Sequence, residues 1–259
     1  MPRKKSFCLL LLSLFLLCVP APTAQAKAPD TMGTVQIHQH QFPAMDIDGD
    51  GRNDAVSLVY QEAINVGQET ILHFAMGSQR HYVFSLGINP RRTIVEIDAG
   101  DVTGDGMRDV LLSTTASDEA GNTVLEYFVL QFTSESVHTL PLPTYGTGQI
   151  GYAFESSFDT HATLNLIAPA GNFLLRAPLD PAQVGKLYTP DGHIADIPCV
   201  VQGVSHIALT AYGAGCALSM DQPITTTALP KPLGVMRSTI VFQNGEARLV
   251  MQQFKPAPI

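Results

Sequence analysis

The 259-residue sequence lacks the features that would place it among helical or membrane-spanning proteins. A membrane-spanning helix needs about 20 apolar residues, and the apolar run Phe7–Val19 is shorter than that. No stretch keeps an apolar period of 3.6 residues over a dozen positions, and signals for the start of a helix are few. These absences leave β structure as the expected fold class.

The sequence also lacks the short motifs of common catalytic sites. It contains no Gly-x-Ser-x-Gly, no His-Glu-x-x-His and no Gly-x-x-x-x-Gly-Lys. The histidines are scattered, and none forms a recognisable pair with a nucleophile. We therefore expect a non-catalytic protein. The alternative is an extracytoplasmic hydrolase with a calcium-stabilised N-terminal scaffold, whose pocket in the second half would group two or more of Asp159, His161, His193, Asp196 and His206.

The first 26 residues have the pattern of a secretory signal peptide. Three cations, Arg3, Lys4 and Lys5, precede the apolar run, and Ala24-Gln25-Ala26 forms a small-residue cleavage site. The interpretation is cleavage after Ala26, which leaves no transmembrane anchor. The mature protein is then expected to be exported, either periplasmic or secreted.

Cations and cysteines are both scarce once this segment is removed. The mature chain has 12 basic and 23 acidic residues, a formal charge of −11, which disfavours nucleic acid as a partner and favours a cation. Of the four cysteines only Cys199 and Cys216 remain. An oxidising compartment predicts a Cys199–Cys216 disulfide, although two buried free thiols are the open alternative, because a disulfide also requires Cα atoms within about 7 Å.

Short apolar stretches rich in β-branched and aromatic residues recur between Gly, Pro, Asn and Asp residues, which is typical of strands. The predicted strands are residues 55–60, 71–76, 81–86, 93–97, 110–115, 124–132, 207–212, 239–242 and 247–254. The residues 158–166 and 203–209 resemble weaker copies of the same loop-and-strand pattern without its acids. The fold class is therefore predicted to be all-β.

Two acidic loops repeat with a constant offset of 55 residues. The first is DIDGDGRND, residues 46–54, and the second is DVTGDGMRD, residues 101–109; each runs into an apolar strand. Two matched loops are harder to explain as ordinary Asp-Gly turns than one loop would be. The unit is therefore a loop followed by a strand, used twice.

The spacing of the acids suits a loop that wraps around one cation. Alternate residues point toward the centre, so positions 1, 3, 5 and 9 supply side-chain oxygens and position 7 a backbone carbonyl, while glycine at position 6 allows the sharp turn. Hard oxygen ligands without sulfur or imidazole favour Ca²⁺. The predicted ligands are Asp46, Asp48, Asp50, Arg52 (carbonyl) and Asp54 in one site, and Asp101, Thr103, Asp105, Met107 (carbonyl) and Asp109 in the other.

Two details refine this prediction. An EF-hand closes its loop with an acid at position 12, where this chain has Ser57 and Leu112, so an EF-hand is excluded. Thr103 replaces a carboxylate with a hydroxyl, so we expect weaker binding in the second loop.

At these residues the sequence resembles the FG-GAP or VCBS-type repeats of integrin α-subunits and of secreted bacterial proteins. The resemblance covers residues 40–140 and implies β-propeller-like blades with Ca²⁺ bound between blade strands. Two loops imply a partial or small propeller, since a full ring would have more. The expected organisation is a signal peptide (1–26), two calcium-binding repeats (27–150) and a divergent β-rich region (151–259), in a module that recognises a protein or glycan of the cell envelope.

Overall fold

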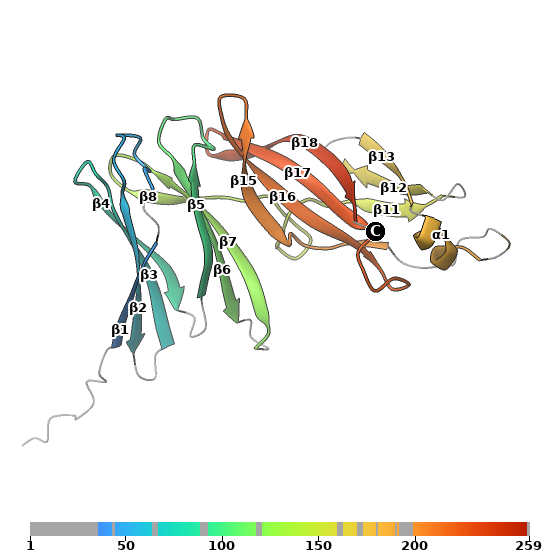
Figure 1. Ribbon diagram of the computed structural model, residues 1–259, viewed down its shortest axis with the longest axis horizontal. Helices are drawn as coiled ribbons and strands as arrows, with labels where there is room; N and C mark the ends of the chain where they lie inside the picture. The colour runs from blue at the N-terminus through green and yellow to red at the C-terminus, as the bar shows by residue number, and fades with distance from the viewer. Residues whose placement is uncertain are drawn as a thin grey trace, which may run out of the picture. The chain divides into compact units, whose positions relative to one another are not determined.

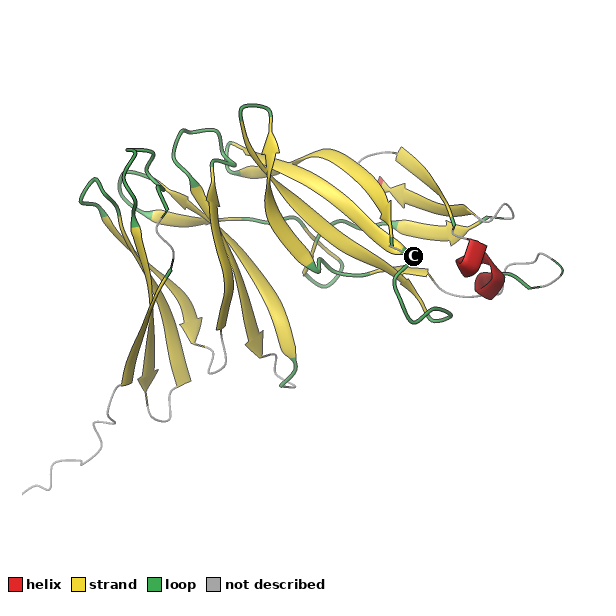
Figure 2. Cartoon of the chain, in the orientation of Figure 1, coloured by secondary structure: helices red, strands yellow, loops and turns green. Residues whose placement is uncertain are grey.

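The computed structural model describes residues 36–257, except for 43–44, 64–66, 89–92, 118–120, 160–162, 170–172, 180, 190 and 192–198. The predicted signal peptide, residues 1–26, lies outside the described residues. Figure 2 shows that nearly all described elements are strands. Among the described residues the one α-helix is α1 (Pro181–Leu187). The all-β prediction is confirmed. Within the described ranges, no helix is both long enough and apolar enough to cross a membrane.

The first half of the chain forms two four-stranded antiparallel sheets with the same order (Figure 1). The first sheet consists of β1 (Gln36–Gln41), β2 (Ala55–Ala63), β3 (Gly67–Ala75) and β4 (His81–Ile88). The second consists of β5 (Thr93–Gly100), β6 (Asp109–Ser117), β7 (Thr123–Phe132) and β8 (Val137–Leu140). In each sheet the acidic loop joins the first strand to the second.

The second half forms one long sheet and two small ones. The long sheet contains β14 (Cys199–Val201), β15 (His206–Tyr212), β16 (Gly215–Thr226), β17 (Gly234–Gln243) and β18 (Glu246–Pro256). The small sheets are β9 (Thr144–Tyr145) with β10 (Gln149–Ile150), and β11 (Glu155–Phe158), β12 (Thr163–Ala168) and β13 (Phe173–Pro178). The nine strand ranges expected from the sequence lie on strands β2 to β7, β15, β17 and β18, except that Met76 falls one residue beyond the end of β3.

The second sheet is covered on both faces. On one face Val110, Leu112 and Leu130 pack with Leu72 and Phe74 of the first sheet. On the other face its side chains pack with the long sheet, in a core formed by Leu111, Val129, Leu218, Met220 and Ile240. This double burial explains why residues 109–114 of β6 are all buried, instead of alternating between buried and exposed positions.

Side chains on one face of the long sheet pack into two separate hydrophobic cores. Side chains at alternate positions of β16 share a face, and along that face Leu218 and Met220 pack on the second sheet while Ile224 packs with Leu164 and Leu166 of β12. Gln222 lies between these two groups on the same strand and is fully buried. The region beyond residue 150 therefore continues the packing of the first half.

Candidate metal site

The first acidic loop is folded around hydrogen bonds from its own backbone to its aspartates. The N–H of Gly51 donates to Oδ2 of Asp46 (3.2 Å), that of Asp50 to Oδ1 of Asp48 (3.3 Å) and that of Arg52 to Oδ1 of Asp50 (2.8 Å). Gly51, at position 6, has a φ of 81°, a left-handed conformation that glycine adopts at little cost. In each of these three carboxylates, one oxygen therefore accepts a hydrogen bond from the backbone of the loop itself.

The same three carboxylates also lie close to one another. One oxygen each from Asp46, Asp48 and Asp50 lies within 4.8 Å of the others. Oδ1 of Asp46 and Oδ2 of Asp48 are buried, and neither has a hydrogen-bond partner in the described structure. A buried polar atom without a partner costs about 1–3 kcal/mol, and gathered like charges add repulsion. A hard divalent cation would relieve both costs, and three carboxylates fit the oxygen ligands that Ca²⁺ prefers.

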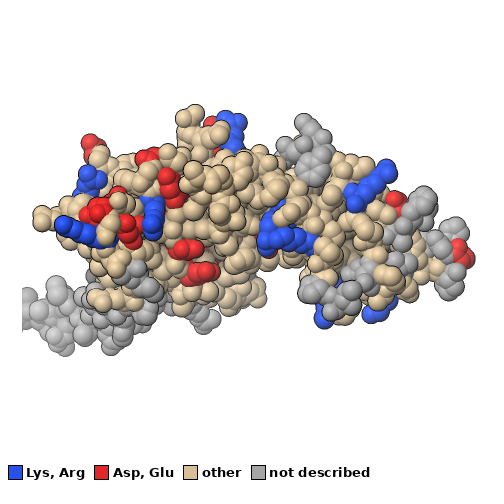
Figure 3. Space-filling model, turned by 45° about the horizontal axis from the view of Figure 1, so that its top comes forward, with Lys and Arg blue, Asp and Glu red and all other residues tan. Residues whose placement is uncertain are grey.

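A turn from another part of the first sheet covers this loop. It is the β3–β4 turn, residues 76–80, whose Gly77 N–H donates to Oδ1 of Asp54 at 2.6 Å. The hydroxyl of Ser78 lowers the pKa of Asp48, partly opposed by desolvation, with smaller help from backbone N–H groups and from the charge of Arg80. Figure 3 shows acidic side chains gathered at one end of the molecule with basic side chains beside them. This turn is not apparent from the sequence, because Gly77 lies 23 residues from Asp54 and no local pattern links the two segments.

Asp54, the predicted ligand at position 9, lies outside the converging group. It is 1% exposed, and its two oxygens accept hydrogen bonds from the N–H groups of Ile47 (2.5 Å), Asp48 (3.3 Å) and Gly77. Asp54 therefore closes the loop through the backbone, and the structure brings only Asp46, Asp48 and Asp50 together. The side chain of Arg52, whose carbonyl is the other predicted ligand of this loop, is exposed.

The second loop has the same backbone course but satisfies its carboxylates internally. Asp101 accepts from the N–H of Gly104 (2.5 Å) with one oxygen and from that of Gly106 (3.0 Å) with the other. Asp105 accepts from Met107 N–H (2.9 Å) and from the side-chain amide of Gln131 (3.1 Å). Neither aspartate keeps a buried oxygen without a partner in the described residues.

Position 9 of the second loop repeats the role of Asp54. Asp109 is 1% exposed, and its Oδ2 accepts from the N–H groups of Val102 (2.9 Å) and Thr103 (3.0 Å) and from the Thr103 hydroxyl (3.1 Å). Burial raises the pKa of Asp109 to about 6, although these hydrogen bonds oppose the rise. Thr103, a predicted ligand, thus donates to a neighbouring carboxylate in this structure.

The two loops are bonded to each other and to the long sheet. Arg108 N–H donates to the carbonyl of Ile47 at 2.7 Å, which links the second loop to the first. The carbonyls of Asp101 and Val102 in turn accept from the N–H groups of Cys216 (3.1 Å) and Phe242 (3.2 Å). Backbone hydrogen bonds therefore connect the first loop to the second loop, and the second loop to the long sheet.

The predicted disulfide between Cys199 and Cys216 is wrong, because both thiols are free. Cys199 pairs with Thr226 at one end of β16, and Cys216 lies at the other end of that strand, ten residues away. At about 3.3 Å per residue the two cysteines are about 30 Å apart, far beyond the 7 Å limit. The second alternative, two free thiols, is the one that the structure supports.

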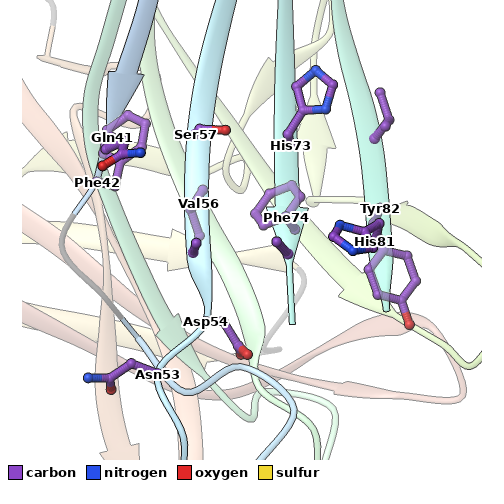
Figure 4. Close-up of a pocket in the computed structure, with 13 residues that line it drawn as sticks. Gln41, Phe42, Asn53, Asp54, Val56, Ser57, His73, Phe74, His81 and Tyr82 are labelled. Carbon is purple, nitrogen blue, oxygen red and sulfur yellow. The ribbon is translucent and has the colours of Figure 1, made fainter. Parts of the chain in front are cut away.

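The described residues offer no support for the hydrolase alternative. His161, His193 and Asp196 lie outside them, while Asp159 follows β11 and His206 begins β15, in different sheets. A depression of about 430 Å³ on the open face of the first sheet includes Ser57, His73 and His81 (Figure 4). The rings of His73 and His81 project from that exposed face, and no hydrogen bond joins Ser57 to His73, so the described depression contains no assembled nucleophile and base.

Comparison of the chain with protein-family models, with curated proteins and with solved structures finds no match in any of the three.

Proposed function

We propose that this chain is an exported, non-catalytic calcium-binding β protein, in which the loop 46–54 is the principal site and the loop 101–109 a weaker one. The observation that carries the proposal is the pair of buried, unpartnered oxygens on Asp46 and Asp48, in a group of three aspartates, with Asp50, whose carboxylates each place one oxygen within 4.8 Å of the others. The carbonyl of Arg52 is the fourth proposed ligand. In the second site an ion would have to replace hydrogen bonds that the loop now makes internally. The proposed ligands there are Asp101, Thr103, Asp105, Asp109 and the carbonyl of Met107.

The bound ion is proposed to act as a structural element. It would neutralise the first loop, and that loop is bonded through Ile47 and Arg108 to the rest of the structure. The two similar sheets, each with a loop between its first and second strands, are the feature in favour of propeller-like blades of the FG-GAP or VCBS type. The rigid sheets are proposed to present a surface to a protein or glycan partner in the cell envelope.

Calorimetric titration of the mature protein with CaCl₂ tests the calcium site. We expect binding in the range of extracellular modules, about 10⁻⁴–10⁻³ M, abolished by Asp50→Ala and retained in Asp105→Ala. Asp105→Ala is the matched control because it occupies the same position in the second loop. Absence of calcium uptake by the wild-type protein, or equal loss in both variants, would contradict a principal site at the first loop.

A further inference from the structure

The residue Gln131 occupies the place in the second sheet that Met76 occupies in the first. The pairs between the second and third strands of each sheet run from Ala55↔Ala75 to Glu62↔Gln68 in the first sheet, and from Val110↔Leu130 to Ser117↔Thr123 in the second. The two registers differ by the same offset of 55 residues that relates the acidic loops. That offset also relates Met76 to Gln131, so the two positions can be compared directly.

The side chains at these two positions differ in what they can donate. Methionine carries no N–H or O–H, and Met76 is 4% exposed, within the core between the first two sheets. Gln131 is half-buried, and its side-chain amide donates to Oδ2 of Asp105 at 3.1 Å. An ionised carboxylate only accepts hydrogen bonds, so the amide nitrogen must face it. Of the two residues, Gln131 alone brings a donor to position 5 of its loop.

The carboxylate at position 5 of the first loop is Asp50, which has different surroundings. Its Oδ1 accepts from Arg52 N–H at 2.8 Å. Gly77 lies so close to this carboxylate that a Cβ there would be 3.1 Å from Oδ2 and 3.3 Å from Oδ1, but glycine has no side chain with which to donate. Within the described residues, the bond from Gln131 to Oδ2 of Asp105 has no counterpart at Oδ2 of Asp50.

Gln131 therefore uses the oxygen of Asp105 that the second loop itself leaves free. Oδ1 of Asp105 accepts from Met107 N–H at 2.9 Å, within the loop, and Oδ2 accepts from the Gln131 amide. The hydrogens of an amide N–H₂ carry partial positive charge, and its nitrogen only donates, so this group cannot coordinate a cation. An ion that used Oδ2 would have to displace a hydrogen bond to an ionised group, which is stronger than one between neutral groups.

We propose that Gln131 is the residue that weakens calcium binding at the second loop, because its side-chain amide takes the place of the ion at Asp105. The replacement of a carboxylate by Thr103 is one difference between the loops, and Gln131 is a second one, which lies outside the loop. This inference rests on the proposed function, since it concerns the weaker of the two proposed calcium sites.

The test is an NMR titration of the mature protein with CaCl₂ in the Asp50→Ala background, which removes the principal site. The backbone amide signals of Gly104 and Gly106 report on the second loop, including binding that is too weak for calorimetry. Gln131→Met installs the residue type of the first sheet. It should strengthen calcium binding at the second loop at least about threefold, as expected for the loss of one competing hydrogen bond. A further Asp105→Ala substitution should remove this gain.

Gln202→Met is the matched control. It makes the same chemical change at a glutamine whose side-chain amide donates to the hydroxyl of Thr225 (2.9 Å) and not to a loop carboxylate, so the titration should not change. If Gln131→Met does not fold, Gln131→Ala removes the same donor without adding bulk and takes its place.

Thermal unfolding gives a second measurement in the same Asp50→Ala background. Gln131→Met should lower the midpoint in EGTA, because Asp105 loses a donor, and calcium should then raise the midpoint of this variant by more than that of its parent. An equal fall in both buffers would show that Gln131 has only a structural role, and would overturn the proposal.

The outcomes of the titration separate this inference from the proposed function. Unchanged affinity in Gln131→Met would overturn the inference, and so would weaker binding, which would make the amide oxygen of Gln131 a ligand. If wild type takes up no calcium in calorimetry but Gln131→Met binds it at the second loop, the role of Gln131 holds and the principal site is wrong. If neither protein binds calcium, both are wrong.

Discussion

The backbone N–H of Arg108 donates to the carbonyl oxygen of Ile47, at 2.7 Å, and so ties one acidic loop to the other. Ile47 is fully buried between the first two sheets and lies between Asp46 and Asp48 in the chain. Whatever stiffens the first loop therefore also holds the position of this carbonyl. The proposed ion would act on the junction of two sheets as well as on its own ligands.

Calcium should slow hydrogen exchange at Arg108, a residue of the other loop. Ligand binding protects groups whose opening breaks the site, and opening of the first loop releases the acceptor of the Arg108 amide. We expect clearly slower exchange of peptides containing Arg108 in calcium than in EGTA, measured by mass spectrometry. The effect should vanish in Asp50→Ala, while peptides from β12 serve as the internal control. Equal exchange in both buffers, with calcium binding verified, would rule out coupling between the loops.

The buried carboxyl of Asp109 predicts a pH dependence of stability in the absence of calcium. Its folded pKa of about 6 lies above the ordinary value of 3.8, so the folded state binds the proton more tightly than the unfolded state. The contribution of Asp109 to stability therefore increases as the pH falls from 7 through 6 toward 4, and is lost as the pH rises through 6. The amide of the Asp109→Asn variant cannot titrate. In EGTA, wild type should gain stability relative to Asp109→Asn between pH 7 and pH 5 by urea denaturation.

Comparison with this single substitution cancels the titration of the other carboxylates, some of which act in the opposite direction, as Asp48 does with its lowered pKa. Asp109→Ala is the second comparison. It leaves the N–H groups of Val102 and Thr103 without their acceptor and should cost about 1–3 kcal/mol at pH 7. A difference between wild type and Asp109→Asn that does not change with pH would show that the Asp109 carboxyl does not titrate in this range.

The strands and the two loops were predictable because their signals are local. Short apolar stretches rich in β-branched and aromatic residues mark β2 to β7 in the sequence. Glycine at position 6 of each loop does adopt the left-handed conformation that the pattern requires, with φ of 81° at Gly51 and 90° at Gly106. The spacing also identified Asp46, Asp48 and Asp50, the aspartates that converge.

What the sequence did not predict depends on which segments meet in space. Asp54 and Asp109 have the right residue type and spacing for ligands, but the pattern does not say that their oxygens bind backbone N–H groups instead. The turn that contains Gly77 and Ser78 covers the first loop only because β3 and β4 form a hairpin beside it. A disulfide was predicted because only two cysteines remain in a chain that is expected to reach an oxidising compartment. The register of β14 on β16 instead places these two cysteines far apart.

Gly151 is predicted to be intolerant of any side chain. Its φ is 126°, and a Cβ there would lie 2.6 Å from Cδ of Gln222, a fully buried residue. Gln222 has no freedom to move away, because its amide accepts from Tyr152 N–H (2.9 Å) and donates to the carbonyls of Tyr152 (3.0 Å) and Gln202 (3.2 Å). Gly151→Ala should therefore lower the free energy of unfolding by at least about 2 kcal/mol, measured by urea denaturation. Gly203→Ala is the control, since its nearest neighbour would lie at 3.8 Å, and it should change stability by less than half as much.

Because both cysteines are free, the stability of the protein should not depend on reductants. Because about 30 Å of β16 separates Cys199 from Cys216, no intramolecular disulfide can form in the native state, even in an oxidising compartment. Thermal unfolding should give the same midpoint with and without dithiothreitol, and Ellman's reagent should titrate two thiols after unfolding of the mature, non-reduced protein. Burial raises the pKa of the Cys199 thiol, against a smaller opposing effect of Ser156, so native Cys199 should react more slowly than a free thiol. Cys199→Ser should leave the dithiothreitol result unchanged, and a midpoint that falls on reduction in wild type alone would restore the disulfide and contradict the register of β14 on β16.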